Sequence, residues 1–409
     1  MPRPRCAMSA FVMILLLAAS APAFQSSTGL SQADPESIGL DSGRLSRIDE
    51  TVQAAIRRKE LPGAVVLVAR HGRIGYVRAF GNRALKPRDE PMTIDTIFDM
   101  ASLTKVMATA PSVMILVQDG QVRLGDRVKR YLPGFTGGGK DDITVRMLLT
   151  HHSGLRPDFD LSTPWEGYAA ALAELWKENT ESKPGTEFKY SDLNFIALGE
   201  IVRAVSGKDL DAFAQERIYQ PLGMADTGFR SPDDKLPRIA PTESRARSLA
   251  YLKGEASGAE IQEILRGRVH DPTAWRMGGT AGHAGLFSSA RDVALYAQML
   301  LNEGVYGDRR VFAPATVRAM TSSQSPKQSA SVRGFGWDID TSYSAPRGDL
   351  FEGGFGHTGF TGTSLWIHPP SATFVLILSN RVHPDGSGDV THLRGAVANI
   401  VAAAIRDGS

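Results

Sequence analysis

The stretch Ser102–Asp119 reads SLTKVMATAPSVMILVQD, and Gly120 follows it. Apolar residues fill most of this stretch, and a glycine after such a run is a common helix end, so we predict a helix here. Its first four residues have the form S-x-x-K. Residues three apart share one face of a helix, so we expect Ser102 and Lys105 to lie side by side at the N-terminal end. Pro111 is expected to kink this helix.

A serine and a lysine in this arrangement can perform nucleophilic chemistry. A serine hydroxyl is a weak nucleophile and needs a base within hydrogen-bond reach. A lysine that is partly desolvated in a cleft has a lowered pKa and can accept the proton. The free N–H groups at a helix N-terminus also favour developing negative charge. On these four residues alone, an ordinary helical serine and lysine remain an equal alternative.

Two further segments carry groups that an acyl-transfer site needs. Residues 184–194 read PGTEFKYSDLN, and their tyrosine, Tyr190, comes just before a predicted helix at Ser191–Ser206, where a phenol can point into a cleft. Residues 356–362 read GHTGFTG and precede a predicted strand. Their small side chains allow a backbone amide to approach a bound acyl group, as an oxyanion donor must.

In this order, the three elements resemble those of the serine β-lactamase and penicillin-binding-protein superfamily, and most nearly its class C β-lactamase and D,D-carboxypeptidase branch. The phrases at Met147–Leu155 and Gly282–Ser288 add to the resemblance, which extends over nearly the whole chain after residue 23. It implies an acyl-enzyme on Ser102 and no cofactor. It also implies that Lys105 assists deprotonation of Ser102.

The resemblance assigns roles to further residues. Tyr190 would be the general base or the acid for the leaving group. The backbone N–H groups of Ser102 and Phe360 would form the oxyanion hole. Substrate contacts would come from four residues of the second and third motifs: Asp192, His357, Thr358 and Gly359.

Two of these residues depart from the family pattern. The second motif usually reads Tyr-x-Asn, but Asp192 replaces the amide and cannot donate a hydrogen bond when ionised. It could instead pair with Lys105, keep the lysine charged and leave the base role to Tyr190. The third motif usually reads Lys-Thr-Gly, but His357 replaces the lysine and removes a permanent positive charge. Both changes argue against an efficient β-lactamase.

One sub-branch fits better still. Residues 269–274 read VHDPTA, and together with the other motifs they resemble exported serine hydrolases linked to peptidoglycan recycling, some of them N-acetylmuramyl-L-alanine amidases. We therefore expect a hydrolase that cleaves an amide or ester, with a cell-wall fragment as its substrate. An esterase, or a D,D-carboxypeptidase with weak β-lactamase activity, is the alternative. A slowly acylating penicillin-binding sensor is the non-enzyme alternative, which the presence of Ser102, Lys105 and Tyr190 disfavours.

The N-terminus predicts export. A basic start, an apolar run at residues 11–19 and the sequence Ala21-Pro22-Ala23 indicate a signal peptide over 1–23 and a periplasmic or secreted protein. The single cysteine, Cys6, lies inside it, so the mature chain would have no disulfide. No later apolar run approaches the length of a membrane span. The sequence leaves the oligomeric state open.

Charge and histidine spacing exclude several classes of partner. The chain has 46 Lys and Arg against 44 Asp and Glu, so no basic excess is available to bind nucleic acid. No histidine pair has the H-x-x-x-H spacing of a metal site, so no metal is expected. We expect loop and capping contacts for His151 and His152, and structural hydrogen bonds for His270 and His283.

The element order predicts an α/β (α+β) fold of the β-lactamase/transpeptidase type. Both chain ends should join in one antiparallel sheet flanked by helices, with a large helical lobe inserted between them. The predicted division is 24–98 with 302–409 for the sheet lobe and 99–301 for the helical lobe, with an irregular excursion at 231–275. Predicted strands are 64–69, 74–80, 334–340, 363–368 and 373–378. Further helices are predicted at 41–59 and 391–406.

Overall fold

The computed structural model describes residues 1–2, 29–162, 164–230, 232–244 and 263–406. Residues 3–23 of the expected signal peptide and residues 245–262 of the expected excursion therefore lie outside the described part. Among the described residues, no helix combines the length and apolar character that crossing a membrane requires.

One antiparallel sheet of eight strands joins the two ends of the chain, as predicted. Its strand order is β3-β2-β1-β12-β11-β10-β9-β8, so β1 from the start of the chain pairs with β12 from its end. The strands are β1 (Gly63–Arg70), β2 (Arg73–Ala84), β3 (Glu90–Pro91), β8 (Val332–Arg333), β9 (Asp338–Asp340), β10 (Phe355–Thr358), β11 (Ser364–His368) and β12 (Thr373–Ser379). Two small two-stranded sheets lie outside this sheet: β4 (Ile97–Asp99) with β5 (Phe287–Ser289), and β6 (Val305–Tyr306) with β7 (Arg309–Arg310).

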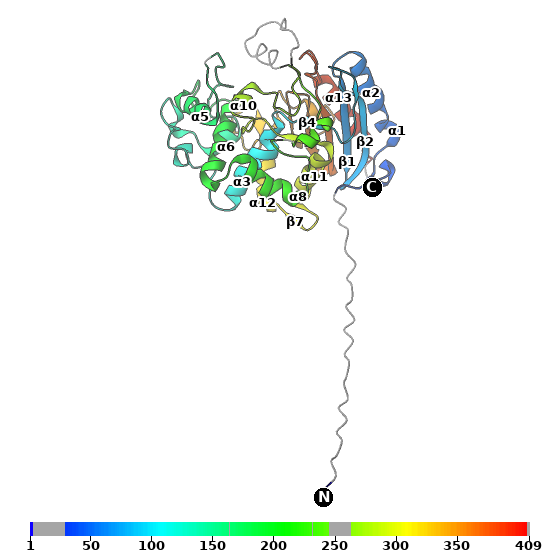
Figure 1. The fold of residues 1–409 in the computed structure, drawn as a ribbon, viewed down its shortest axis with the longest axis horizontal. Helices are drawn as coiled ribbons and strands as arrows, with labels where there is room; N and C mark the ends of the chain where they lie inside the picture. The colour runs from blue at the N-terminus through cyan, green and yellow to red at the C-terminus, as the bar shows by residue number, and fades with distance from the viewer. Residues whose placement is uncertain (3–28, 163, 231, 245–262, 407–409) are drawn as a thin grey trace.

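Helices cover both faces of the sheet (Figure 1). On one face lie α1 (Ser42–Leu45), α2 (Arg47–Arg57) and α13 (Thr391–Ala404). The other helices are α3 (Ala110–Gln118), α4 (Val145–Leu149), α5 (Tyr168–Lys177), α6 (Asp192–Ser206), α7 (Leu210–Ala214), α8 (Gln220–Leu222), α10 (Pro272–Arg276), α11 (Ala290–Leu301) and α12 (Pro314–Thr321). Of these, α11 packs against β1 and β12. The predicted division into two lobes stays a prediction.

The central strands separate two hydrophobic cores. In β1, Val65 and Leu67 belong to the core under the long helical segment, whereas Val66 and Val68 belong to the core under α2 and α13. Strand β12 alternates in the same way. Successive side chains of a strand point to opposite faces, so a strand covered on both faces is apolar at every position.

Two predicted elements differ in the structure. The strand expected at 334–340 is a tight hairpin, because Gly336 has a positive φ of 81° and the Gly334 N–H donates to the Trp337 carbonyl over 2.9 Å. The segment expected only to precede a strand contains β10 itself. Both differences arise from glycines that turn the chain sharply, which apolar patterning does not reveal.

The helix predicted at 102–119 begins with a turn and a π-helical segment, η2 (Lys105–Thr109), before α3. Pro111 lies in the first turn of α3, where its missing N–H is tolerated. The carbonyl of Met107, four residues earlier, accepts instead from the Tyr219 hydroxyl at 3.3 Å. We expected Pro111 to kink the helix. The irregularity is the π-helical segment Lys105–Thr109, which lies just before the proline.

Candidate active site

Lys105 connects the expected nucleophile to the second motif. Its ammonium Nζ lies 2.9 Å from Ser102 Oγ and 2.7 Å from the Asp192 carboxylate, and it donates to the His283 carbonyl at 3.0 Å. The side chain of Lys105 is fully buried, whereas Ser102 is partly exposed. The three-residue spacing therefore places the two groups in hydrogen-bond contact, as predicted.

The turn that carries Ser102 is strained. Ala101, directly before it, has a positive φ of 47°, which non-glycine residues rarely adopt. The Ala101 N–H donates to Asp99 Oδ1 at 2.9 Å, and this bond helps to hold the conformation. Residues kept in such conformations cluster at functional sites, where the surrounding structure enforces them. The residue after this strained position is Ser102, which is partly exposed and lines a cavity.

The expected lowering of the Lys105 pKa is wrong. Burial alone would lower the pKa of the ammonium, but the Asp192 carboxylate and the Tyr190 phenol outweigh burial and raise it. Lys105 is therefore a cation at neutral pH and cannot accept a proton there. The Asp192 departure noted in the sequence has the consequence considered for it, a direct ion pair with the lysine.

Tyr190 lies over the lysine, just before α6. Lys105 Nζ is 5.0 Å from the centroid of its ring. The imidazole of His151 stacks on the Tyr190 ring at a centroid distance of 4.3 Å, and its Nδ1 accepts from the Ser191 N–H at 3.0 Å. The backbone bond fixes the segment next to Tyr190, so His151 positions the phenol. The expectation of simple loop and capping contacts missed this role.

The third motif packs onto the turn of the nucleophile. Thr361 Oγ1 donates to the Asp99 carbonyl at 2.7 Å, and Thr363 Oγ1 donates to the Met100 carbonyl at 3.1 Å. A Cβ on Gly359 would lie 2.1 Å from Thr363 Oγ1, so only glycine allows this approach. The β10–β11 turn, which carries Phe360, is thereby held against the residues just before Ser102.

His357 does not replace the positive charge of a lysine. Its Nδ1 lies 2.8 Å from the Thr358 carbonyl, so this nitrogen carries the proton of a neutral ring. Burial first, and then the nearby charges of Arg333 and Lys105, hold the pKa of the imidazole well below its usual range. His357 is therefore uncharged at neutral pH.

A cavity of about 460 Å³ opens at Ser102. It brings together six of the predicted site residues: Ser102, Tyr190, His357, Thr358, Gly359 and Phe360. Lys105 and Asp192 lie beside it and are linked to it through Ser102. The cavity also has lining residues that sequence reasoning missed: Arg333, Asp338, Tyr343, Arg381, Asp389, Thr391 and Arg394. These come from hairpin β8–β9, the loop after it, the end of β12 and the start of α13, none of which carried a motif.

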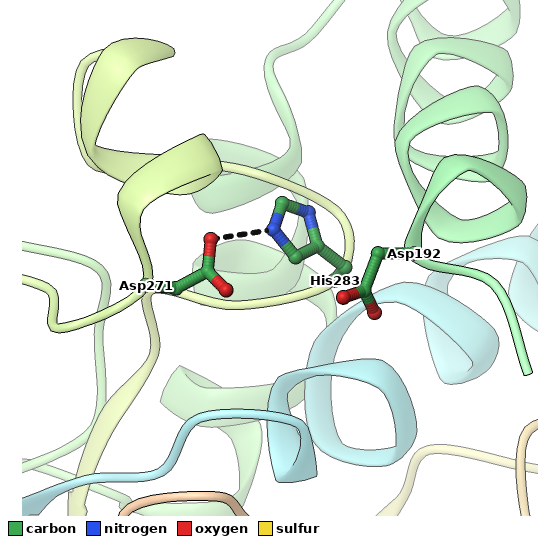
Figure 2. Close-up of side chains that lie close together, drawn as sticks. All are labelled: Asp192, Asp271 and His283. Carbon is green, nitrogen blue, oxygen red and sulfur yellow. Dashed lines mark hydrogen bonds and ion pairs between the residues drawn. The ribbon is translucent and has the colours of Figure 1, made fainter. Parts of the chain in front are cut away.

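A second polar cluster, formed by Asp192, Asp271 and His283, is drawn in Figure 2, and Lys105 contacts two of its residues, Asp192 and His283. His283 Nε2 is 2.8 Å from Asp271 Oδ1, and ligand-type atoms of Asp192, Asp271 and His283 lie within 4.8 Å of one another. Burial would lower the pKa of His283, but Asp271 raises it, and His283 in turn lowers the pKa of Asp271. Each carboxylate thus already has a cationic partner, so we interpret the cluster as an ion-pair network. His283 has the structural hydrogen bond expected for it.

Asp158 completes this network from the loop before α5. Thr273 Oγ1 lies 2.8 Å from its Oδ2. Burial, together with the negative charges of Asp271 and Asp192, raises the pKa of Asp158 to about 7. Of Asp158 and Asp271, Asp158 is therefore the one that holds a proton more easily.

His270 supports the rim of the cavity. Its ring stacks on Phe360 at a centroid distance of 5.7 Å, and its Nε2 lies 2.7 Å from Glu243 Oε1. Its backbone N–H donates to Asp99 Oδ2 at 2.7 Å. The structural hydrogen bonding expected for His270 is therefore present, and it links the cavity rim to the strand before Ser102.

Comparison with known proteins agrees with this geometry. The family model described as Beta-lactamase matches residues 48–399. The chain belongs to this family. It is 33% identical over 386 residues to an Escherichia coli (strain K12) protein that carries the provisional name D-alanyl-D-alanine carboxypeptidase, with 87% of this chain and 86% of that protein covered. Family membership and this relative support a serine hydrolase of the β-lactamase and penicillin-binding-protein superfamily.

Solved structures show the same fold. EstCE1, described as a hydrolase with promiscuous acyltransferase activity, has a TM-score of 0.69 and 24% identity, covering 88% of this chain and 99% of its own. A β-lactamase/D-alanine carboxypeptidase from Pseudomonas syringae has a TM-score of 0.68 and 17% identity, covering 88% and 98%. At these identities the likeness concerns the fold alone. It confirms the predicted β-lactamase/transpeptidase-like architecture.

Proposed function

We propose that this chain is an exported hydrolase that cleaves an amide of a cell-wall peptide through an acyl-enzyme on Ser102. The observation that carries the proposal is the contact of Lys105 Nζ with both Ser102 Oγ and Asp192, at the wall of a cavity of about 460 Å³. A fixed cation beside a serine hydroxyl lowers the cost of forming the alkoxide. The proposed compartment is the periplasm or the exterior of the cell, after removal of residues 1–23.

Tyr190 is the base in the proposed mechanism, because Lys105 is already protonated. The Ser102 hydroxyl gives its proton to the oxygen of Tyr190, which reacts in its phenolate form and becomes a neutral phenol, while Oγ bonds to the substrate carbonyl carbon. The carbonyl oxygen becomes an oxyanion, for which we assign the N–H groups of Ser102 and Phe360 as donors. Tyr190 then returns the proton to the leaving nitrogen as the C–N bond breaks. Water cleaves the resulting ester by the same steps, with Ser102 as the leaving group.

Charge at the cavity supports a substrate with a carboxylate. Arg381 and Arg394 line the cavity and donate to the carbonyls of Phe360 and Gly359, in the turn of the third motif. Cell-wall peptides carry free carboxylates, and the Escherichia coli relative is named for a peptide that ends in D-alanine. We therefore place a D-Ala-terminated or muramyl peptide first among substrates. Thr358, Gly359 and Asp192 are the further proposed contacts.

Ester hydrolysis is the second candidate. The specific observation that favours it is the neutral His357, which supplies no charge to a substrate anion where the family pattern has a lysine. An uncharged acyl ester would lose less from this change than a peptide with a carboxylate. A carboxylesterase of family VIII is among the similar folds, with a TM-score of 0.67.

The first experiment is intact mass spectrometry of the purified protein after exposure to a fluorophosphonate and, separately, to penicillin. Ser102→Ala is the test variant, and Ser46→Ala, at an exposed serine between α1 and α2, is its matched control. We expect one adduct on the wild type and on Ser46→Ala, and none on Ser102→Ala. An adduct that persists on Ser102→Ala would contradict the proposal, as would a wild type that neither reagent labels.

Product release then separates the substrates. The enzyme is incubated with an N-acetylmuramyl pentapeptide that ends in D-Ala-D-Ala, with an N-acetylmuramyl-L-alanine peptide and with p-nitrophenyl butyrate. Release of D-alanine indicates a D,D-carboxypeptidase, and release of the peptide from muramic acid indicates an amidase. Turnover of the butyrate alone would favour the esterase. The mass of the protein recovered from the periplasm should place its first residue at Phe24.

A further inference from the structure

Tyr190 has two permanent positive charges beside it, and only one belongs to a sequence motif. Lys105 Nζ lies 5.0 Å from the centroid of the Tyr190 ring, and the guanidinium carbon of Arg333 lies 5.9 Å from it. Lys105 is paired at 2.7 Å with Asp192 and hydrogen-bonded to Ser102. Arg333 comes from β8, at the other end of the chain.

Of the other titratable groups near Tyr190, the Asp192 carboxylate is paired with Lys105, and the two imidazoles and the phenol of Tyr343 are neutral at pH 7. His151 and His357 lie at ring distances of 4.3 and 6.1 Å, and burial holds the pKa of each imidazole well below its usual range. Tyr343 lies at 5.2 Å, and burial raises the pKa of its hydroxyl. Neither the imidazoles nor this phenol can therefore supply the second charge.

Arg333 is buried in an unusual way. Its side chain has no exposed surface, and its Nη2 donates to the Gly336 carbonyl at 2.6 Å. Among the described residues, its Nε and Nη1 find no hydrogen-bond partner. The nearest carboxylate, Asp338, stands 3.6 Å from Nη1 and accepts from the hydroxyls of Thr341 and Ser344 at 2.7 and 2.8 Å. The guanidinium is thus weakly compensated.

Burying a cation with unsatisfied donors is costly, and a purely structural role would be better served by an apolar side chain. Arg333 lines the cavity, but its Nε and Nη1 atoms are buried. Its guanidinium carbon lies over two rings, those of Phe188 at 5.8 Å and Tyr190 at 5.9 Å, and of these two only Tyr190 lines the cavity. Its charge therefore acts on the site through Tyr190.

We propose that Arg333 is a positioning residue that supplies Tyr190 with a second permanent positive charge, which neutral His357 does not give, and thereby stabilises the negative charge on the Tyr190 oxygen in the reaction with Ser102. This inference rests on the proposed function, in which Tyr190 is the base. It assigns the task to a side chain from β8, outside the three motifs of the sequence.

The test is the pH dependence of Ser102 labelling by a fluorophosphonate, from about pH 5 to about pH 10. This reagent has no carboxylate, so a role of Arg333 in holding a substrate anion would not change its labelling rate. An opposite charge about 4–6 Å away shifts an ionisation by roughly 1–3 pH units. We therefore expect Arg333→Met to move the acidic limb of the profile up by about one unit or more, with a rate about tenfold lower at neutral pH that recovers in alkali.

Three further variants make the result specific. Arg333→Lys keeps the charge and should return the limb most of the way to the wild-type position. Arg333→Met with His357→Lys moves the charge to the other side of the site and should also restore it. Arg146→Met removes an exposed arginine that contacts Phe335 and should leave the profile unchanged. Coincident profiles for wild type and Arg333→Met, with Ser102 still labelled, would overturn the inference while leaving the proposed function intact.

Where Arg333→Met fails to fold, a titration of the wild type decides. Tyrosinate absorbance near 295 nm is followed with pH for the wild type and for Tyr190→Phe, which lacks the phenol. The inference requires one tyrosine that ionises below the ordinary range and is absent from the variant. Superimposable titrations below about pH 9 would overturn it. Absence of any wild-type labelling would instead count against the proposed function itself.

Discussion

Lys105 and Arg333 are both buried cations beside Tyr190, yet their surroundings differ. Lys105 has its carboxylate at 2.7 Å, and it also contacts Ser102 Oγ and the His283 carbonyl. Arg333 has its carboxylate at 3.6 Å, and its Nε and Nη1 have no hydrogen-bond partner within the described part of the chain. The comparison separates two uses of charge. One cation is tied to the reacting hydroxyl by direct contacts, and the other acts at a distance through its field.

We expect the largest effect from a substitution that removes the direct contact between Lys105 and Ser102. Lys105→Met removes the cation next to Ser102 Oγ, and a group that assists proton transfer typically contributes about 10²- to 10⁴-fold to the rate. We expect the labelling of Ser102 by a fluorophosphonate to slow by about 10³-fold, well beyond the loss expected for Arg333→Met. Time courses of adduct formation by intact mass measure both. Equal losses in the two variants would remove the distinction between contact and field.

Asp192→Asn tests the ion pair of Lys105 by removing the charge of its carboxylate partner. Asp192 raises the pKa of Lys105, so the pair stabilises the fold below the unfolded lysine value and loses this contribution as pH rises through the folded pKa. With Asp192 about one-fifth exposed, we expect a loss of about 1–3 kcal/mol in unfolding free energy that stays constant from about pH 6 to about pH 9.

Urea unfolding at several pH values measures this loss. Asp142→Asn is the control, because the Asp142 carboxylate and its partner Arg127 are largely exposed and should contribute about 0–1 kcal/mol. A difference between wild type and Asp192→Asn that disappears by about pH 8 would mean that Lys105 loses its proton near neutrality.

Asp158→Asn tests the buried carboxylates near Lys105 in place of the cations. The folded state raises the pKa of Asp158 to about 7, so its contribution is full below about pH 4 and is lost as pH rises through about 7. An amide resembles the protonated carboxyl and has no such loss. We expect the variant to gain about 1–3 kcal/mol relative to wild type between about pH 5 and about pH 8. Thermal unfolding at the two pH values measures this gain, and parallel curves would show that Asp158 is not perturbed.

The smallest effect is expected at Tyr343, which contacts Tyr190 without a charge. Its ring lies 5.2 Å from Tyr190 and is 44% exposed at the cavity. Tyr343→Leu removes an aromatic wall and leaves both cations in place. Surface changes of this kind alter free energies by about 0.5 kcal/mol, so we expect kcat/KM to fall by less than about threefold with an unshifted pH profile. A shifted profile would mean that the phenol environment depends on more than the cations.

Much of the fold could be predicted from local patterns. The alternation of β1 and its tight turn to β2 indicated a hairpin, and helical spacing at both ends indicated α2 and α13. The joining of both ends in one sheet followed from the instability of a lone hairpin. The β8–β9 hairpin could not be predicted, because a strand pattern does not show that Gly336 turns the chain back.

The site could be predicted where it consists of motifs and not where it consists of packing. Ser102, Lys105, Tyr190 and the His357 segment meet as expected. The three-residue spacing predicted the contact of Ser102 with Lys105, and the resemblance of the motifs predicted the rest. Whether the pKa of Lys105 is raised or lowered depends on its contact with Asp192. The sequence suggested this contact as one alternative but could not decide it. Arg333 carried no signal at all: an arginine in a short strand is usually exposed, and only the fold turns this one inward.

The charge state of Lys105 is the most direct test of the whole account. The protein is labelled with lysine carrying ¹³C at Cε, and the Lys105 resonance is assigned by its absence from Lys105→Met. The account predicts that this resonance keeps the shift of a charged ammonium from about pH 6 to about pH 9, because the nearby carboxylate and phenol raise the pKa of Lys105. A resonance that titrates near pH 7 would contradict it, since a neutral lysine would then be the base and Tyr190 would not need its two cations.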